Sequence, residues 1–195
     1  MNTSTGPTRF VPSEMDNGFL VSLRQNIVKF LTGASALYAT ADSLILDVAP
    51  QDNGGATSFF PAGARVETLD ISPDAGCTYV ADLCRTNSNI PNDRFDIVVC
   101  TEVLEHTVQP FDAVRELHRI LKPEGVLLLS TPYNFRIHGP LPDCWRFTEH
   151  GLRVLLDRFE ILALTPLESP NRPLMPIQYT VAARKSPLPG NLGTP

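Results

Sequence analysis

The sequence of 195 residues predicts an α/β fold with a mostly parallel sheet, on the evidence of three neighbouring segments. Residues 95–100 and 126–129 are two continuous apolar runs, a pattern typical of parallel strands that are covered on both faces. Between them, Phe111, Val114 and Leu117 recur at the spacing of one helical face. Strand, helix and strand in this order form the crossover unit of a parallel sheet.

Composition and charge exclude several classes of protein. The length fits one domain, which we expect over 16–185, between an irregular segment 1–15 and a disordered tail 186–195. The net charge of −5 argues against a general nucleic-acid binder, which would carry a basic surface. The sequence contains neither a run of about 18 apolar residues nor a signal-peptide core, so we expect no membrane contact. The four cysteines lack zinc spacing, and we expect reduced thiols in a cytoplasmic protein.

The elements before the crossover unit follow from apolar periodicity. Apolar residues at helical spacing predict a helix over 18–37, which Gly33 is expected to end. Short apolar segments indicate the first three strands: 43–48, 65–71 and 78–83. Only residues 72–77 separate the second and third of these strands, which leaves room for little more than a turn.

The elements after the crossover unit are also short. Residues 132–147 read PYNFRIHGPLPDCWRF, which is too rich in proline for a helix. Thr148 is a suitable N-cap for a helix that ends at Leu156. Residues 159–164 and 177–183 are predicted strands, joined by a proline-rich loop.

The central segment resembles the class I S-adenosylmethionine-dependent methyltransferases. The resemblance rests on FDIV at 95–98, EVLEH at 102–106 and LHRILKPEG at 117–125, and extends from about Leu44 to Arg184. It implies a Rossmann-like, doubly wound sheet whose last strand is antiparallel. It also implies S-adenosylmethionine as cofactor, S-adenosylhomocysteine as product, and a cap at 132–147 over the reaction centre.

Candidate cofactor residues follow the ends of the predicted strands, where open parallel sheets bind ligands. The residues we assign to the cofactor are Asp47, Ala49, Asp70, Ile71, Asp82, Leu83, Thr101 and Glu102. The family has a glycine-rich turn after its first strand, whereas Ala49, Gln51 and Asn53 stand where glycines are usual.

The two aspartates have specific expected roles. Asp70 lies about 20 residues beyond Asp47, a separation at which an acid can bind both ribose hydroxyls. By resemblance, Asp82 accepts the adenine amino group and the Leu83 backbone meets the ring. The alternatives stay open: Asp70 as an ordinary turn aspartate, and segment 49–55 as an ordinary loop.

His106 and His138 are the candidate general bases, because histidine titrates near neutral pH. A structural histidine is the alternative for each. Side chains that we consider for the acceptor pocket are Tyr133, Asp143, Trp145 and Arg146. Glu102, Glu105, His106 and His138 also resemble the Glu-x-x-Glu-His motif of metal-dependent RNA 2′-O-methyltransferases and some quinone O-methyltransferases. We assign no metal, because ligand spacing alone is weak evidence.

The resemblance therefore implies a methyltransferase that modifies an oxygen or nitrogen of a small molecule, such as a specialised metabolite or a sugar. One alternative is a catalytically inactive binding protein of the same fold, suggested by the altered loop 49–55. Another is a metal-assisted RNA 2′-O-methyltransferase, against which the acidic charge counts. The oligomeric state does not follow from the residues.

Overall fold

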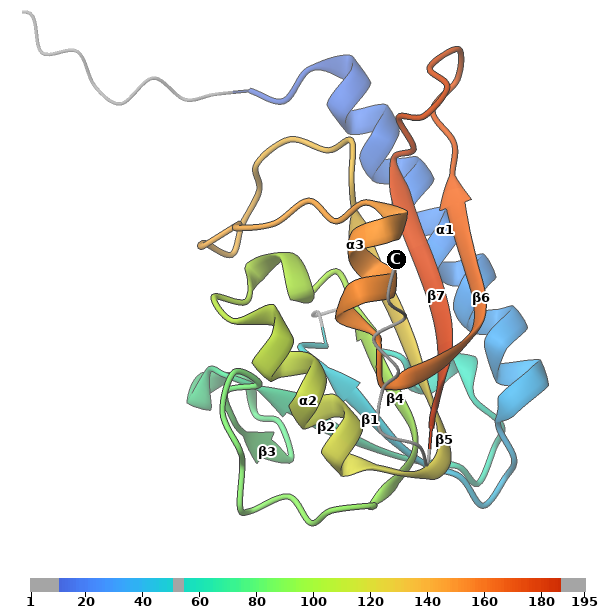
Figure 1. Ribbon diagram of the computed structural model, residues 1–195, viewed down its shortest axis with the longest axis vertical. Coiled ribbons are helices and arrows are strands. Elements are labelled where there is room, and N and C mark those ends of the chain that lie inside the picture. The colour runs from blue at the N-terminus through green and yellow to red at the C-terminus, as the bar shows by residue number, and fades with distance from the viewer. Residues whose placement is uncertain (1–10, 51–54, 187–195) are drawn as a thin grey trace, which may run out of the picture.

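The computed structural model describes residues 11–50 and 55–186, which form a seven-stranded sheet with helices on both faces (Figure 1). The helices are α1 (Glu14–Tyr38), α2 (Pro110–Ile120) and α3 (Glu149–Leu155). The strands are β1 (Leu44–Val48), β2 (Arg65–Asp70), β3 (Tyr79–Val80), β4 (Phe95–Thr101), β5 (Leu121–Pro132), β6 (Phe159–Leu167) and β7 (Gln178–Lys185).

The order of the strands is β3-β2-β1-β4-β5-β7-β6. The pairs from β3 to β5 are all parallel, whereas β7 runs antiparallel to both of its neighbours, β5 and β6. This arrangement confirms the predicted Rossmann-like α/β sheet and its antiparallel last strand. The carboxyl ends of β1 and β4 lie side by side, which is where such a sheet forms a crevice.

Two apolar layers explain why β4 and β5 are continuously hydrophobic. On one face, Val98 and Cys100 pack in a core with residues of α2 and α3. On the other face, Ile97 and Val99 pack with Leu31 of α1. Figure 1 shows α1 behind the sheet and α2 with α3 in front of it. Since successive strand residues point to opposite faces, both faces of these strands must be apolar.

Helix α1 is longer at both ends than the sequence predicted. It begins at Glu14 rather than at 18, because Ser13 and Asp16 form a capping box. It also continues through Gly33 to Tyr38. A glycine inside a helix costs only about 1 kcal/mol, and burial of Leu31 and Ala34 against the sheet outweighs that cost.

The strands differ from the prediction in two places. Strand β3 has only two residues, and its predicted end at Asp82 and Leu83 lies in a turn. Strand β5 begins earlier, at Leu121, and bulges before Val126 resumes the pairing with β4. A side chain on Gly125 would lie 2.9 Å from the Lys122 carbonyl oxygen, so the bulge needs a glycine.

The predicted turn after β2 and the predicted cap of α3 are observed, whereas β6 and β7 run past their predicted ends, to Leu167 and Lys185. One residue on the predicted apolar face of α2 is an exception. The turn between β2 and β3 is a 3-10 helix at Pro73–Ala75, and Thr148 caps α3 as expected. Phe111 is the exception, since 54% of its surface is exposed. Residues 133–148, most of the cap, form neither helix nor strand. Among the described residues, we find no helix with the length and apolar character needed to cross a bilayer.

Candidate active site

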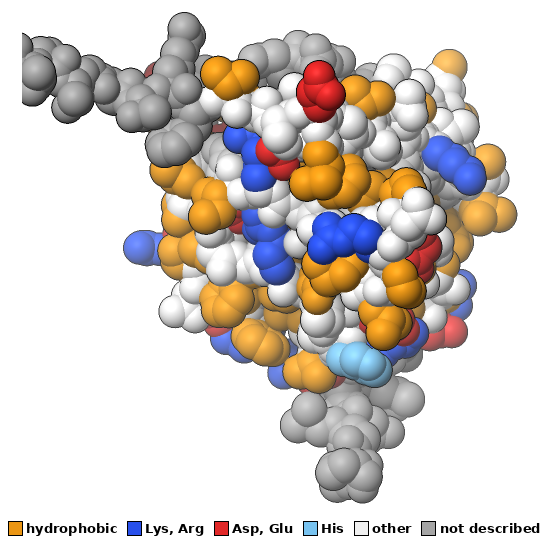
Figure 2. All heavy atoms as spheres, turned by 90° about the horizontal axis from the view of Figure 1, so that it is seen from above, with side chains coloured by type: hydrophobic (Ala, Val, Ile, Leu, Met, Phe, Trp, Pro, Cys, Tyr) orange, Lys and Arg blue, Asp and Glu red, His pale blue; other side chains and the backbone are white. Residues whose placement is uncertain are grey.

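A cavity of about 350 Å³ lies between α1 and the carboxyl ends of β1 and β4. Its wall on α1 is mainly apolar and includes Leu20, Leu23 and Ile27. Opposite them lie the polar residues that follow the strands, and Phe135 and His138 contribute from the cap. Figure 2 views the molecule from above, where hydrophobic side chains gather together with Lys and Arg. Within the cavity itself, the apolar wall on α1 faces two acidic residues, Asp47 and Glu102.

At the end of β1, Asp47 anchors the loop that borders the cavity. Its Oδ2 accepts a hydrogen bond from the Ala56 N–H at 2.6 Å, and burial raises the pKa of Asp47 to about 6. Gly55 has a φ of 57°, and a Cβ there would lie 2.6 Å from the same Oδ2. Residues 51–54 of the predicted 49–55 turn lie outside the described part of the chain. In this loop, glycine is thus required at 55.

Ala49 adopts the backbone conformation that a glycine would usually have at this position of the loop. Its φ is 51°, in the left-handed region that glycine normally occupies. The Ala49 N–H donates to the Leu69 carbonyl at 2.7 Å, which holds this conformation. Glu102, directly after β4, has a φ of 55°. Strained residues of this kind persist where the surrounding structure fixes them, and they gather at functional sites.

Glu102 lines the cavity and is held by two uncharged donors. Its Oε1 accepts hydrogen bonds from Ser130 Oγ at 2.7 Å and from Gln178 Nε2 at 2.8 Å. Gln178 is fully buried, and its Oε1 accepts from Asn26 Nδ2 of α1 at 2.7 Å. Burial raises the pKa of Glu102 to about 7. A carboxylate and the helix that covers the cavity are therefore linked by one chain of hydrogen bonds.

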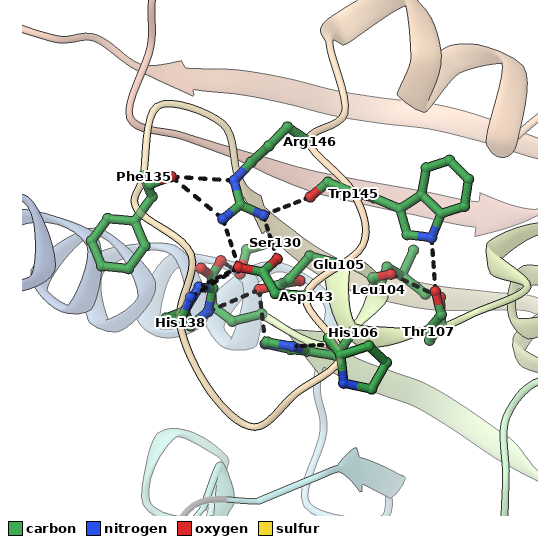
Figure 3. Close-up of polar contacts among 12 residues, drawn as sticks. Leu104, Glu105, His106, Thr107, Ser130, Phe135, His138, Asp143, Trp145 and Arg146 are labelled. Atoms are coloured by element: carbon green, nitrogen blue, oxygen red, sulfur yellow. Dashed lines mark hydrogen bonds and ion pairs between the residues drawn. The ribbon is translucent and has the colours of Figure 1, made fainter. Parts of the chain in front are cut away.

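Next to this chain, Glu105 and two histidines form a compact cluster (Figure 3). Glu105 lies on a 3-10 helix, Leu104–His106, and is fully buried. The Nε2 atoms of His106 and His138 each lie 3.7 Å from Glu105 Oε1, and possible ligand atoms of the three residues lie within 4.8 Å of one another. No described residue donates a hydrogen bond to either Glu105 oxygen. Burial raises the pKa of Glu105 well above its usual value.

Groups outside this cluster orient the two histidines. Pro142 carbonyl oxygen lies 3.0 Å from His106 Nδ1, which must therefore carry the proton in that contact. His138 Nδ1 lies 3.1 Å from Asp143 Oδ2. In His106 the neutral form then has its free lone pair on Nε2, 3.7 Å from Glu105 Oε1, whereas no described residue forms a hydrogen bond with His138 Nδ1 that would fix its tautomer. Burial lowers the pKa of His138, so the neutral imidazole predominates at pH 7.

Arg146 holds the cap in place above the cluster (Figure 3). Its guanidinium binds both oxygens of Asp143, at 2.5 and 2.8 Å, and lowers the pKa of Asp143 to about 2. It also donates to the Phe135 and Arg136 carbonyls. Trp145 Nε1 donates to the Thr107 carbonyl at 2.7 Å. These side chains, considered above for the acceptor pocket, stabilise the cap through their own contacts.

The cavity brings together only some of the predicted site residues. Those that line it are Asp47, Ala49, Thr101, Glu102 and His138. Those that do not are Asp70, Ile71, Asp82, Leu83 and His106.

Asp70 and Asp82 each cap their own turn. Asp70 Oδ1 accepts from the Ser72 N–H at 2.7 Å, and Asp82 Oδ1 accepts from the Cys84 N–H at 2.9 Å. Such contacts are typical of aspartates in turns, which is the alternative left open for Asp70. In each aspartate the hydrogen bond to the turn uses Oδ1 and not Oδ2. Ligand binding by this pair therefore stays a prediction.

Sequence reasoning missed Arg24 and Gln178. Arg24 lines the cavity from α1 between apolar residues. Gln178 is a fully buried polar residue at the start of an apolar strand, and that exception to the apolar pattern was the available signal.

A family model described as a methyltransferase domain matches residues 26–163 of this chain. Ubiquinone biosynthesis O-methyltransferase of Haemophilus ducreyi is 41% identical over 54 residues, which are 28% of this chain and 23% of that protein. The same enzyme of Xanthomonas oryzae pv. oryzae is 32% identical over 112 residues, 50% of this chain and 46% of that protein. The chain thus spans less than half the length of these curated relatives.

Among solved structures, a Burkholderia thailandensis 1,6-didemethyltoxoflavin-N1-methyltransferase with bound S-adenosylhomocysteine is similar in fold. It is 19% identical, with a TM-score of 0.56 over 91% of this chain and 93% of that chain. At this level of identity the likeness concerns the fold alone.

Proposed function

The chain belongs to the methyltransferase-domain family, and from that premise we propose that it moves a methyl group from S-adenosylmethionine to an oxygen or nitrogen of a small molecule. The observation that carries this proposal is the cavity beyond β1 and β4, which has a carboxylate at the end of each strand and a neutral histidine within reach. The names of the relatives and of a structural neighbour, which include O- and N-methyltransferases, support both acceptor types.

The cavity suits the cofactor in charge and in polarity. Asp47 and Glu102 are acidic groups whose burial raises their pKa values, so a cationic ligand is favoured beside them. The apolar side chains of α1 offer a surface for the uncharged parts of the ligand. Asp70 and Asp82 remain our candidates for the ribose and the adenine. The cofactor supplies an activated methyl group, and the protein must orient the acceptor and exclude water.

His138 is the general base in this proposal. It lines the cavity, and its neutral imidazole can accept the proton that an acceptor hydroxyl or amine loses during transfer. Asp143, whose pKa is lowered to about 2, lies 3.1 Å from His138 Nδ1, so its negative charge favours the imidazolium that forms. His106, the other candidate base, does not line the cavity but packs edge-on against the His138 ring, so we propose that it positions His138. The four cysteines are free thiols, which supports a cytoplasmic site of action.

The proposal is tested by binding first and by turnover second. Calorimetry with S-adenosylmethionine and S-adenosylhomocysteine should give micromolar or tighter dissociation constants. Incubation with labelled donor and a panel of phenols, catechols, amines and sugars should then transfer label to at least one acceptor. Cofactor binding without any transfer would favour the inactive binding protein, whereas absence of binding at millimolar concentration would refute the proposal.

A second candidate is metal-assisted transfer, favoured by the arrangement of Glu105, His106 and His138. Three possible ligand atoms converge there, and the other nitrogen of His106 contacts the Pro142 carbonyl, as the other nitrogen of a metal-binding histidine commonly does, while that of His138 lies 3.1 Å from Asp143 Oδ2. Such an ion would supply a positive charge that stabilises a deprotonated acceptor oxygen. Glu102 does not belong to the cluster, since only Glu105, His106 and His138 bring their possible ligand atoms within 4.8 Å of one another.

Metal analysis distinguishes the two candidates. If the second is correct, the purified protein should retain about one equivalent of a divalent ion, and a chelator should lower its melting temperature. Glu105→Gln should abolish both effects, since it removes the charged ligand. A melting temperature unaffected by the chelator and by added Mg²⁺, Mn²⁺ or Zn²⁺ would exclude metal-assisted transfer.

A further inference from the structure

The carboxylate of Glu102 is held so that one oxygen is occupied and the other remains for a ligand. Both donors, Ser130 Oγ and Gln178 Nε2, bind Oε1. None of the described residues donates a hydrogen bond to Oε2, and the side chain lines the cavity. Since Ser130 and Gln178 are uncharged and fully buried, they orient the carboxylate without neutralising it.

Asn26 determines which way the Gln178 amide points. Its Nδ2 donates to Gln178 Oε1, so the amide nitrogen of Gln178 must face Glu102. The chain of hydrogen bonds therefore runs in one direction from α1 to the carboxylate. When α1 is docked over the cavity, Glu102 is fixed. Its left-handed backbone, with φ at 55°, is fixed at the same time by an N–H bond to the Ser130 carbonyl at 3.0 Å.

The charges around Glu102 are strongly unbalanced. Glu105 is a second buried acid, and its pKa is raised by its burial and by the negative charge of Glu102. Arg146 favours the charged form of Glu102, but it is already paired with Asp143. Among the described residues that line the cavity, Arg24 is the one Lys or Arg. It lies on α1, on the wall opposite Glu102. A positive ligand centre beside Glu102 would correct this imbalance.

We propose that Glu102, positioned by Gln178 and Asn26, makes the site prefer the cationic sulfonium donor over the neutral thioether product. This inference rests on the proposed function and adds to it a residue that discriminates between two ligands. The two ligands share the same nucleoside and amino-acid groups, and differ in the methyl group and the charge on sulfur. A fixed carboxylate in a partly buried cavity responds to that charge, because Coulomb interactions are stronger there than in water. Product, once formed, would lose this attraction.

The test compares three ligands that carry different charges at one position. Calorimetry at pH 8, where Glu102 is mainly ionised, should use S-adenosylmethionine, S-adenosylhomocysteine and sinefungin, which has an ammonium group near the sulfur position. Glu102→Gln should weaken both cationic ligands by about tenfold or more, which corresponds to about 1.4 kcal/mol, and the neutral thioether by less than about threefold. Circular dichroism should show that the variant is folded.

Two further variants separate charge from position. Arg24→Met should weaken all three ligands equally, or none of them, because each contains the same carboxylate. Gln178→Met keeps the charge of Glu102 but removes the donor that orients it, so it should reduce the preference for the cations by a smaller factor.

Equal losses for all three ligands in Glu102→Gln, or an unchanged preference in both Glu102→Gln and Gln178→Met, would overturn the inference. If Glu102→Gln does not fold, the result for Gln178→Met alone decides. Failure of the wild-type protein to bind any of the three ligands would instead refute the proposed function.

Discussion

Replacing Arg146 by Met should destabilise the protein far more than replacing an ordinary surface arginine. Arg146 binds both oxygens of Asp143, and the Asp143 side chain is fully buried. Removal of one partner from a buried ion pair leaves the other charge uncompensated, which costs about 3–5 kcal/mol. The backbone N–H of His138 still donates to Asp143 Oδ2 at 3.0 Å, so we expect the lower end of this range.

That loss corresponds to a large shift in melting temperature. For a domain of this size, 1 kcal/mol shifts the melting temperature by about 2–4 °C, so a loss of about 3 kcal/mol predicts a decrease of about 6–12 °C. The matched control is Arg153→Met. Arg153 pairs with Glu149 across one helical turn, but both side chains are about half exposed, and such a pair contributes about 0.5 kcal/mol or less.

Differential scanning calorimetry and urea unfolding should measure both variants, together with Asp143→Asn and the double variant. The double variant should be more stable than Arg146→Met, because it no longer buries an unpaired charge. Equal melting temperatures for Arg146→Met and Arg153→Met, or additive losses in the double variant, would show that the reasoning about this ion pair is incorrect.

The effect of Arg146→Met should also depend on pH. Arg146 lowers the pKa of Asp143 from its usual 3.8 to about 2. Because the folded pKa lies below the unfolded one, the pair stabilises the fold fully above pH 4 and loses this contribution as the pH falls toward 2. The difference in melting temperature between wild type and variant should therefore shrink across that interval.

Other positions provide independent tests. Gly55→Ala should weaken cofactor binding and lower the free energy of unfolding by about 2 kcal/mol or more, because the new Cβ would clash with the Asp47 carboxylate and the alanine would have a left-handed backbone. The calorimetric control is Gly76→Ala, which has the same backbone strain without a clash. His138→Gln should reduce kcat by about 10²–10⁴-fold for acceptors that lose a proton, and should remove the acidic limb of the pH–rate profile. In the wild type this limb should lie below pH 6.5, because burial lowers the pKa of His138. Replacing Asp70 and Asp82 together by Asn should weaken binding of S-adenosylhomocysteine at least tenfold in calorimetry, and unchanged affinity would remove both from the cofactor site.

Much of the fold follows from local sequence patterns. The unit β4–α2–β5 was predictable because its apolar runs and helical spacing reflect burial that each segment shows on its own. The start of α1 was missed although Ser13 and Asp16 carried the signal, because the apolar pattern begins later than the capping box. The short β3 was overestimated because its pairing with β2, limited to two residues, is a tertiary property.

The site was predictable to a lesser degree. Asp47, Thr101 and Glu102, chosen because they lie at strand ends, line the cavity, and their contact with the cofactor stays a prediction. Spacing could not reveal that Glu102 is tied to Gln178, since that contact joins residues 76 positions apart. Spacing also grouped Glu102 with Glu105 as possible metal ligands, whereas the short 3-10 helix after β4 directs only Glu105 toward the histidines. Side-chain direction at a strand end depends on a local turn that periodicity does not describe.

The place of the last strand has a consequence for synthesis on the ribosome. Strand β7 is inserted between β5 and β6, and its Gln178 bonds Asn26, 152 positions earlier in the chain. A nascent polypeptide that stops before this strand has no partner for β6 and cannot orient the carboxylate after β4. The pocket can therefore be completed only after β7 has emerged, so that a product truncated before Gln178 would lack the site even if its first strands had paired.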